Sequence, residues 1–178
     1  MVDRSTAPRG ERQIYVYNPP VVNAELGIRA SYLKRAVNLA SDLIRARVPT
    51  ILFGQSRNAV EIMLKYLRDR FHDQAALRDA IVAYRSGYLP DQRRRVERGL
   101  REGQILCVVA TSALELGIDI GDLDAVVCAG YPGSLAETWQ RFGRAGRRNE
   151  GSIAVLISNS SPVDQYVAHH PRLLFEGN

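Results

Sequence analysis

The stretch QRFGRAGRR at residues 140–148 carries four arginines and two glycines within nine positions. It follows a segment with helical periodicity and precedes a new apolar run, so it connects a predicted helix to a predicted strand. Guanidinium groups beside glycines suit contact with the phosphates of a nucleotide. A solvated basic loop is the other interpretation, and the surrounding chain is needed to choose between them.

Outward from this stretch, apolar strand-like runs alternate with helical periods along almost the whole chain. The strand-like runs are apolar throughout, with little of the alternation expected when one face of a sheet meets water. Both features predict the α/β class, with a parallel sheet covered by helices on both faces. The predicted strands are residues 13–17, 50–53, 80–84, 105–110, 125–128 and 152–158. The predicted helices are residues 28–47, 58–71, 90–101, 112–116, 135–142 and 163–170.

The length of 178 residues fits one domain with a full core. We expect a flexible leader over residues 1–12, the domain over residues 13–171 and a tail over residues 172–178. No apolar run reaches the roughly 18–20 residues of a membrane span. The polar start has no signal-peptide core either, so the sequence predicts a cytoplasmic protein without a membrane partner.

The charge, the cysteines and the histidines indicate which kinds of ligand the protein could bind. The net charge is +5, and all but two of the 24 basic residues are arginine. Codon bias in a GC-rich genome and a need for bidentate phosphate contact both explain that ratio. Cys107 and Cys128 lie in apolar runs, which predicts buried, reduced thiols. The three histidines lack metal-ligand spacing, so no metal site is predicted.

The chain lacks the usual phosphate-cradling loop. That loop needs the order G-x-x-x-x-G-K-[ST], and neither Lys34 nor Lys65 follows a glycine. No Asp is followed directly by Glu, so an Asp-Glu pair that could hold magnesium is missing as well. If the arginines of residues 140–148 meet a nucleotide, another domain must present it.

Four segments in order resemble the C-terminal motifs of superfamily 2 helicases of the DEAD/DEAH-box-like type. Residues 51–57 look like motif IV, residues 84–88 lie where motif IVa would, residues 110–119 resemble motif V, and residues 140–147 resemble motif VI. The resemblance covers nearly the whole chain. It implies a RecA-like parallel sheet, and it implies that the chain is the second RecA-like domain of a larger DNA helicase.

Finer detail is similar to one branch, the mitomycin-repair-type helicases related to RecQ-four-like helicases with a cysteine-rich C-terminal region. The segments that carry this similarity are residues 18–20, 93–97, 114–121 and 162–166. In the family, ATP and Mg²⁺ are bound mainly by the N-terminal RecA-like domain, which the chain lacks. The implied partners are that domain and single-stranded or partly duplex DNA. The chain alone is predicted to be inactive.

The resemblance implies a nucleotide-facing set of residues. Arg144 and Arg147 are the candidate arginine fingers, which would stabilise charge on the γ-phosphate. Their spacing of three would place them on one side of a helix. Gln140, Gly117 and Asp119 would contribute to nucleotide binding, and the alternative role for Asp119 is to stabilise a turn.

A second set would contact the backbone of a single strand. Hydroxyls and arginines at strand ends can hold phosphates without reading bases, which suits a motor that moves on any sequence. The candidates are Ser56, Arg57, Thr111 and, more weakly, Arg85. Ser56 and Thr111 each precede a predicted helix, so helix capping is an alternative role that is compatible with phosphate contact.

Other conspicuous residues favour structural roles. The arginines of residues 93–101 point in different directions on one helix, which favours a solvated, ion-paired face. Tyr131 and Trp139 are expected in the core or at a domain interface. Arg141 and Arg148 stay unassigned. Two other functions remain open, an RNA helicase or non-unwinding translocase domain, and a non-catalytic nucleic-acid-binding module.

Overall fold

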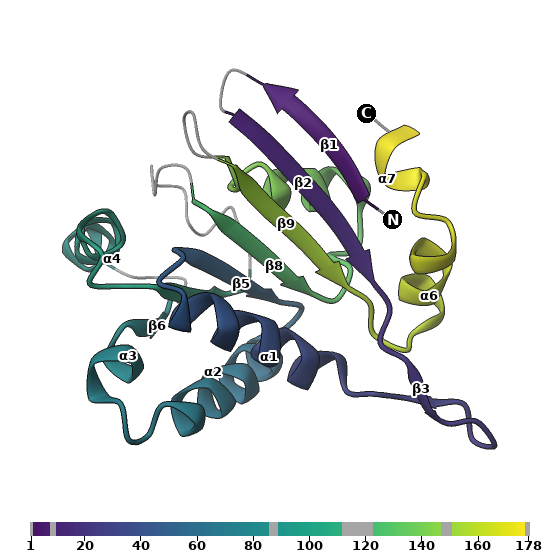
Figure 1. Cartoon of the computed structure of the whole chain (residues 1–178), viewed down its shortest axis with the longest axis horizontal. Coiled ribbons are helices and arrows are strands. Elements are labelled where there is room, and N and C mark those ends of the chain that lie inside the picture. The colour runs from purple at the N-terminus through teal and green to yellow at the C-terminus, as the bar shows by residue number, and fades with distance from the viewer. Residues whose placement is uncertain (1, 8–9, 86–88, 112–122, 147–150, 177–178) are drawn as a thin grey trace.

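The computed structural model describes residues 2–7, 10–85, 89–111, 123–146 and 151–176. A seven-stranded sheet runs through the molecule with helices against both of its faces (Figure 1), which confirms the predicted α/β class. The predicted helix over residues 112–116 and most of the loop after residue 84 lie outside the described residues.

The bounds of the elements follow the predicted pattern closely in the centre of the chain. The strands are β1 Val2–Ala7, β2 Gly10–Tyr17, β3 Val21–Asn23, β4 Ile28–Arg29, β5 Thr50–Gly54, β6 Ile81–Ala83, β7 Cys107–Ala110, β8 Ala125–Ala129 and β9 Ser152–Ile157. The helices are α1 Tyr32–Arg45, α2 Arg57–Arg70, α3 Ala75–Asp79, α4 Pro90–Glu102, α5 Leu135–Phe142, α6 Pro162–His169 and α7 Leu173–Glu176.

The sheet has the order β1-β2-β9-β8-β5-β7-β6. All neighbouring strands from β2 to β6 are parallel, as predicted. The exception is β1, which pairs antiparallel with β2. Without β1, the outer edge of β2 would present unpaired backbone groups to water, and the hairpin satisfies them.

Secondary structure also extends into both segments that the sequence predicts to lie outside the domain. Strand β1 lies within the predicted leader, and β2 begins at Gly10, so the structure does not match a flexible leader there. Helix α7 lies within the predicted tail, and its Leu174 is fully buried in the core. The domain limits themselves remain a prediction.

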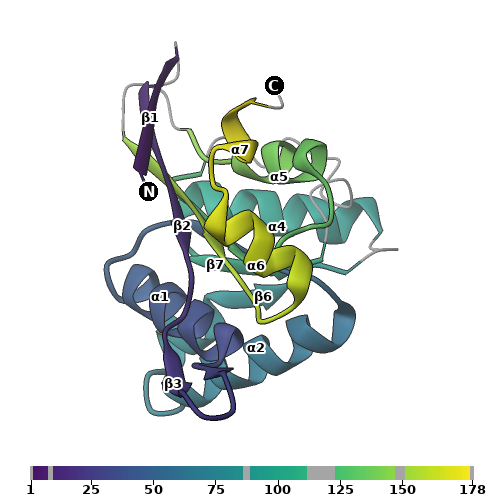
Figure 2. The same ribbon diagram turned by 90° about the vertical axis from the view of Figure 1, so that its right-hand side faces the viewer.

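Two hydrophobic cores lie on opposite faces of the sheet, as the apolar strands require. In β5, Ile51 and Phe53 face the core beneath α4, α5, α6 and α7, whereas Leu52 faces the core beneath α1 and α2. Figure 2 shows α4 and α5 on one side of the sheet and α1 and α2 on the other. Both cysteines, Cys107 and Cys128, are buried free thiols, as predicted.

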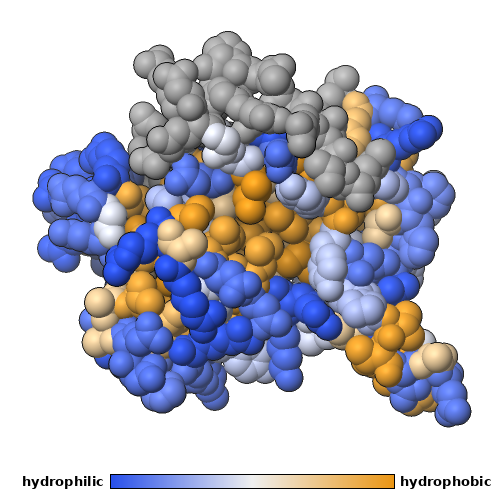
Figure 3. Space-filling view, viewed as in Figure 1, coloured by the Kyte–Doolittle hydropathy of each residue, from blue (hydrophilic) through white to orange (hydrophobic). Residues whose placement is uncertain are grey.

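Helix α1 is shorter than the predicted helix over residues 28–47. It begins at Tyr32 because Ser31 caps it, accepting a hydrogen bond from the Lys34 amide at 3.3 Å. Residues 28 and 29 instead pair with β3 in a small separate hairpin. This hairpin projects from the body and exposes apolar side chains (Figure 3), namely those of Val21, Val22, Leu26 and Ile28.

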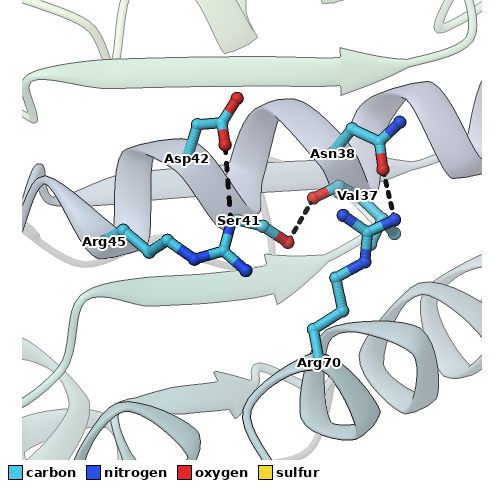
Figure 4. A network of polar contacts seen from close by, with 6 residues as sticks. All are labelled: Val37, Asn38, Ser41, Asp42, Arg45 and Arg70. Carbon is cyan, nitrogen blue, oxygen red and sulfur yellow. Dashed lines mark hydrogen bonds and ion pairs between the residues drawn. The ribbon is translucent and has the colours of Figure 1, made fainter.

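A polar network joins α1 to α2 (Figure 4). Arg70 of α2 donates to the amide oxygen of Asn38 on α1. Within α1, the buried Ser41 hydroxyl donates to the Val37 carbonyl at 2.7 Å, and Arg45 pairs with Asp42 at 3.5 Å. This contact adds to the packing of α1 and α2 in a shared core, and the N-terminus of α2 lies beside the site described next.

Candidate functional site

The candidate site lies at the edge of the sheet where parallel strands end. Strands β5, β7 and β6 are neighbours, so the loops that follow them emerge side by side. In open parallel sheets this carboxyl edge is where ligands bind. The first loop, residues 55–56, leads directly into α2.

These loops enclose a pocket of about 290 Å³. All four residues that the sequence assigns to strand contact line it, although they come from three different strand ends. The lining residues are Ser56, Arg57, Val60, Glu61, Tyr84, Arg85 and Thr111. The structure therefore brings this predicted set together.

Ser56 caps α2, which confirms the capping role. Its side-chain oxygen accepts a hydrogen bond from the Ala59 amide at 3.1 Å. The hydroxyl proton stays available to donate to a ligand because the cap uses only the oxygen as an acceptor. Arg57 is the first residue of the helix and is exposed. The positive end of the helix dipole and the Arg57 guanidinium thus lie together at the pocket, where they favour an anion.

Arg85 is held by an acidic neighbour in the same pocket. Its guanidinium lies 2.7 Å from the carboxylate of Glu61 on α2, and both side chains are about half exposed. An exposed pair of this kind contributes little to stability, on the order of 0–1 kcal/mol. Its effect is to orient Arg85 and to offset part of its charge, which makes Arg57 the stronger candidate for holding a phosphate.

The arginine-rich stretch follows α5, whose start agrees with the prediction. Ser134 caps the helix through the Glu137 amide at 3.1 Å. The helix ends at Phe142, so Arg144 lies beyond it in a turn. Arg144 is therefore not on a helix, and the expected placement of Arg144 and Arg147 on one side of a helix does not hold for it. Arg147 itself lies outside the described residues, as do Gly117 and Asp119.

Backbone hydrogen bonds fix the segment around Arg144. The Leu123 amide donates to the Arg144 carbonyl at 3.0 Å, and the Gly146 amide donates to the Leu123 carbonyl at 3.0 Å. Leu123 and Ala145 form a parallel bridge as a result. Arg144 is half-buried, whereas Gln140 on α5 is exposed. Because these bonds hold the main chain, they restrict the positions that the Arg144 side chain can reach.

Arg141, which the sequence left unassigned, is buried behind the pocket. Only 7% of it is exposed. Its Nη2 donates to the carbonyl of Thr111 at 2.7 Å, and its guanidinium carbon lies 5.0 Å from the centre of the Phe53 ring. Its charge acts to lower the pKa of the neighbouring Cys128 thiol, but burial outweighs that effect and raises the pKa to about 12.

Both aromatic residues near the stretch have structural roles, as expected. Trp139 packs edge-on against Phe142 and Phe175, with ring centres 5.8 and 6.0 Å apart, and its indole nitrogen donates to the Leu174 carbonyl at 2.5 Å. Tyr131 is buried, and burial together with the nearby negative charges of Asp164 and Glu137 raises its pKa.

The predicted basic run on α4 is largely a solvent-facing surface. Arg94 pairs with Asp91 at 3.5 Å, one turn earlier, and both side chains are well exposed. Arg95, Arg98 and Arg101 are exposed as well. This agrees with the expectation of a solvated, ion-paired helix face.

Sequence reasoning missed a polar network on the other half of the same edge. Gln55 donates to the Tyr131 carbonyl at 2.6 Å and accepts from the Asn159 side chain at 2.8 Å. The buried Asp164 carboxylate accepts from the amides of Tyr131 and Asn159 at 2.9 and 3.0 Å. These bonds tie together the ends of β5, β8 and β9. Gln55 and Asp164 lie in segments that carry the family resemblance, but nothing in the sequence indicated that they belong to one network.

Gly130 leaves the space that this network needs. Its φ of +96° is unfavourable for residues with a side chain, and an added Cβ would lie 2.1 Å from the Gln55 side chain. Gln55 can therefore reach across from β5 to β8 only because residue 130 is a glycine.

The described part of the chain contains neither a metal-ligand cluster nor a membrane-spanning helix. No group of three or more His, Cys, Asp or Glu side chains in the described ranges could hold a metal ion. No helix there is long and apolar enough to cross a membrane.

Comparison with known proteins gives consistent matches. The family model described as "Helicase conserved C-terminal domain" matches residues 31–149. The chain is 47% identical over 175 residues to the uncharacterized ATP-dependent helicase YprA of Bacillus subtilis, covering 98% of this chain and 23% of that protein. It is 37% identical over 180 residues to the ATP-dependent helicase HRQ1 of Saccharomyces cerevisiae, covering 100% of this chain and 17% of that protein.

A solved structure matches as well. The crystal structure of the DUF1998 helicase MrfA bound to DNA and AMPPNP superposes with a TM-score of 0.86 at 46% sequence identity, covering 96% of this chain and 23% of that chain. The chain thus spans about a fifth of the length of the curated relatives it matches.

Proposed function

Because the chain belongs to the family of helicase conserved C-terminal domains, we propose that it is the C-terminal motor domain of an ATP-dependent DNA helicase of superfamily 2. Its RecA-like α/β fold and its similarity to YprA, HRQ1 and MrfA agree with this role. In the proposal, the chain grips the backbone of single-stranded DNA and supplies arginine fingers to ATP bound on an N-terminal RecA-like domain. The protein works in the cytoplasm, which fits two free, buried cysteines.

The observation that carries the strand-binding part is the pocket at the ends of β5, β7 and β6. It combines an exposed arginine, a hydroxyl that caps a helix and the N-terminus of that helix. These groups match the charge and the hydrogen-bonding needs of a phosphate, and none of them distinguishes one base from another. Ser56, Arg57 and Thr111 would therefore hold a strand of any sequence, with Arg85 at the side.

The nucleotide-facing part rests on Arg144. A guanidinium beside the γ-phosphate stabilises the charge that develops during phosphoryl transfer. In the described ranges the residues fit phosphate better than Mg²⁺, because Arg144 offers positive charge while no group of ligands for a metal is formed. Gln140, Gly117, Asp119 and Arg147 would complete this face, and Mg²⁺ would be held mainly by the N-terminal domain. Hydrolysis of the bound ATP supplies the free energy for movement.

In the proposal, closure and opening of the two RecA-like domains link ATP hydrolysis to movement along the strand. Closure of the two RecA-like domains around ATP would bring Arg144 to the phosphates, and opening after hydrolysis would withdraw it. Since the strand pocket and the Arg144 segment belong to the same domain, each cycle would shift the strand contacts along the DNA.

The proposal is tested by Arg57→Ala in the full-length protein. We expect weaker binding of single-stranded DNA, and a slope of log affinity against log salt that is shallower by about 0.7, the effect of one lost phosphate contact. Fluorescence anisotropy with labelled oligonucleotides of several sequences measures both quantities. The loss should be the same for every sequence, because a phosphate contact reads no base.

The matched control is Lys65→Ala, which removes one exposed positive charge from the middle of the same helix. It should leave the salt slope unchanged. Equal losses in both variants would mean that only net charge matters, and the assigned pocket would be wrong. A parallel titration with single-stranded RNA decides whether the strand is DNA.

A further inference from the structure

Arg141 has an unusual position for a charged residue. It lies on α5, is almost completely buried, and reaches across to three neighbouring strands of the sheet. Its contacts are the Thr111 carbonyl at the end of β7, the Phe53 ring of β5 and the neighbouring Cys128 of β8. With a pKa raised to about 12, the Cys128 thiol is neutral at physiological pH and offers no negative charge.

An apolar side chain of similar length would fill this space without the cost of removing a charge from water. What it could not do is donate a hydrogen bond to the Thr111 carbonyl. That bond of 2.7 Å is charge-assisted. The guanidinium also lies over the Phe53 ring, whose face attracts a cation. Arg141 is therefore suited to holding the end of β7 and the end of α5 in one fixed relation.

The two segments that Arg141 joins belong to the two halves of the proposed mechanism. Thr111 lines the strand pocket. Arg144 follows Arg141 by three residues, and its amide donates to the Arg141 carbonyl at 3.1 Å. The side chain of Arg141 thus contacts the wall of the pocket, while its main chain holds the turn that carries Arg144.

We infer that Arg141 is a positioning residue that couples the strand held at Thr111 to the placement of Arg144. This inference rests on the proposed function of the two segments. Movement of the Thr111 carbonyl when a strand enters the pocket would be passed through the guanidinium to α5 and its terminal turn. The inference requires that Arg141 itself touches neither the strand nor the nucleotide.

The test is Arg141→Met in the full-length protein, since methionine keeps much of the length and removes the hydrogen bond. The measured quantity is the factor by which AMPPNP changes the affinity for single-stranded DNA. We expect this factor to fall by about tenfold, toward one, which is within the usual range of coupling between sites. Arg141→Lys, which keeps the charge and one donor, should recover part of the factor.

A second readout needs no nucleotide. In the wild-type protein, adding single-stranded DNA should change hydrogen exchange at the amides of residues 143–146. In Arg141→Met this response should disappear. A merely structural role of Arg141 would instead raise exchange in the free protein and leave the response to DNA in place.

The matched control is Arg45→Met. Arg45 also lies over an aromatic ring, 5.1 Å from the centre of Phe71, but it sits on α1 away from both segments. It should keep the wild-type coupling factor. If Arg141→Met keeps that factor too, the inference is overturned. If Arg141→Met does not fold, as judged by circular dichroism, Arg141→Lys decides by the same measurements.

The outcomes separate this inference from the proposed function. If Arg57→Ala does not weaken strand binding, the assignment of the pocket fails. If Arg57→Ala weakens it and Arg141→Met leaves the coupling intact, only the role of Arg141 fails.

Discussion

At the scale of single residues, Arg144 is the side chain that the catalytic proposal depends on most. We predict that Arg144→Ala in the full-length protein lowers ATP hydrolysis by about 10³-fold or more, because an arginine finger contributes on that order to the rate. Strand affinity should be mostly retained, since the pocket residues lie on other elements. Steady-state hydrolysis and strand titrations measure the two effects separately.

Arg98→Ala serves as the control for Arg144→Ala, because it removes an exposed arginine from the outer helix α4. It should leave both quantities near their wild-type values. Near-normal turnover of Arg144→Ala would rule out the finger assignment, whatever the strand affinity.

The residue scale also shows what a sequence can reveal about a site. Ser56, Arg57, Arg85 and Thr111 could be grouped in advance because parallel strands end at one edge, so position along the chain predicts neighbourhood. The role of Arg141 could not, because its direction depends on how α5 is rotated against the sheet. A single residue of rotation would have turned the side chain toward solvent.

At the scale of elements, α5 is held from both ends of the chain. Arg12 of β2 donates to the Phe142 carbonyl at 3.2 Å, and its guanidinium lies 5.7 Å from the Trp139 ring centre. From the other side, Trp139 bonds to the Leu174 carbonyl of α7. Arg12 and α7 both lie outside residues 31–149, which the family model matches. Segments beyond the matched residues therefore help to hold α5 in place.

This bracing predicts a stability effect for Trp139→Phe. Phenylalanine can keep the edge contacts with Phe142 and Phe175 but cannot donate to the Leu174 carbonyl, so the free energy of unfolding should fall by about 1 kcal/mol or slightly more. Trp139 is the only tryptophan, so urea unfolding has to be followed by circular dichroism.

Tyr166→Phe on α6 is the comparison for Trp139→Phe, because its ring is mostly exposed and the substitution keeps it. It should leave the unfolding midpoint unchanged. An unchanged midpoint for Trp139→Phe would mean that α7 adds nothing to the placement of α5.

The shortest elements that the sequence did not predict share a physical cause. Strands β3 and β4 have three and two residues, and α7 has four, too few for a period to emerge. The long elements α2, α4 and α5 were placed within a residue or two because caps mark their ends. Ser56, Pro90, Gly103 and Ser134 are those marks, and Gly103 takes the left-handed conformation at φ +79°.

At the scale of the whole molecule, the carboxyl edge of the sheet divides into two parts. The ends of β5, β7 and β6 form the pocket, and the ends of β2, β9 and β8 are closed by hydrogen bonds that include a reciprocal pair between Asn18 and Gln165 at 3.0 and 2.9 Å. One part thus leaves polar groups lining a pocket, while in the other part polar side chains hydrogen-bond to one another and hold the loops together. In the proposed mechanism, the first part contacts the DNA strand and the second part holds the loops of the first in place.

The same scale gives the last prediction, for the domain by itself. The chain has no G-x-x-x-x-G-K-[ST] loop and no Asp-Glu pair, so it lacks the groups that cradle the phosphates and hold Mg²⁺. We expect the isolated domain to bind single-stranded DNA with the salt dependence of a few phosphate contacts, and to hydrolyse no measurable ATP. It should also fail to unwind a duplex, because a single RecA-like domain has no partner to close against. Hydrolysis by the isolated domain that depends on Arg144 would contradict this, since it would mean that both halves of the nucleotide site lie within these 178 residues.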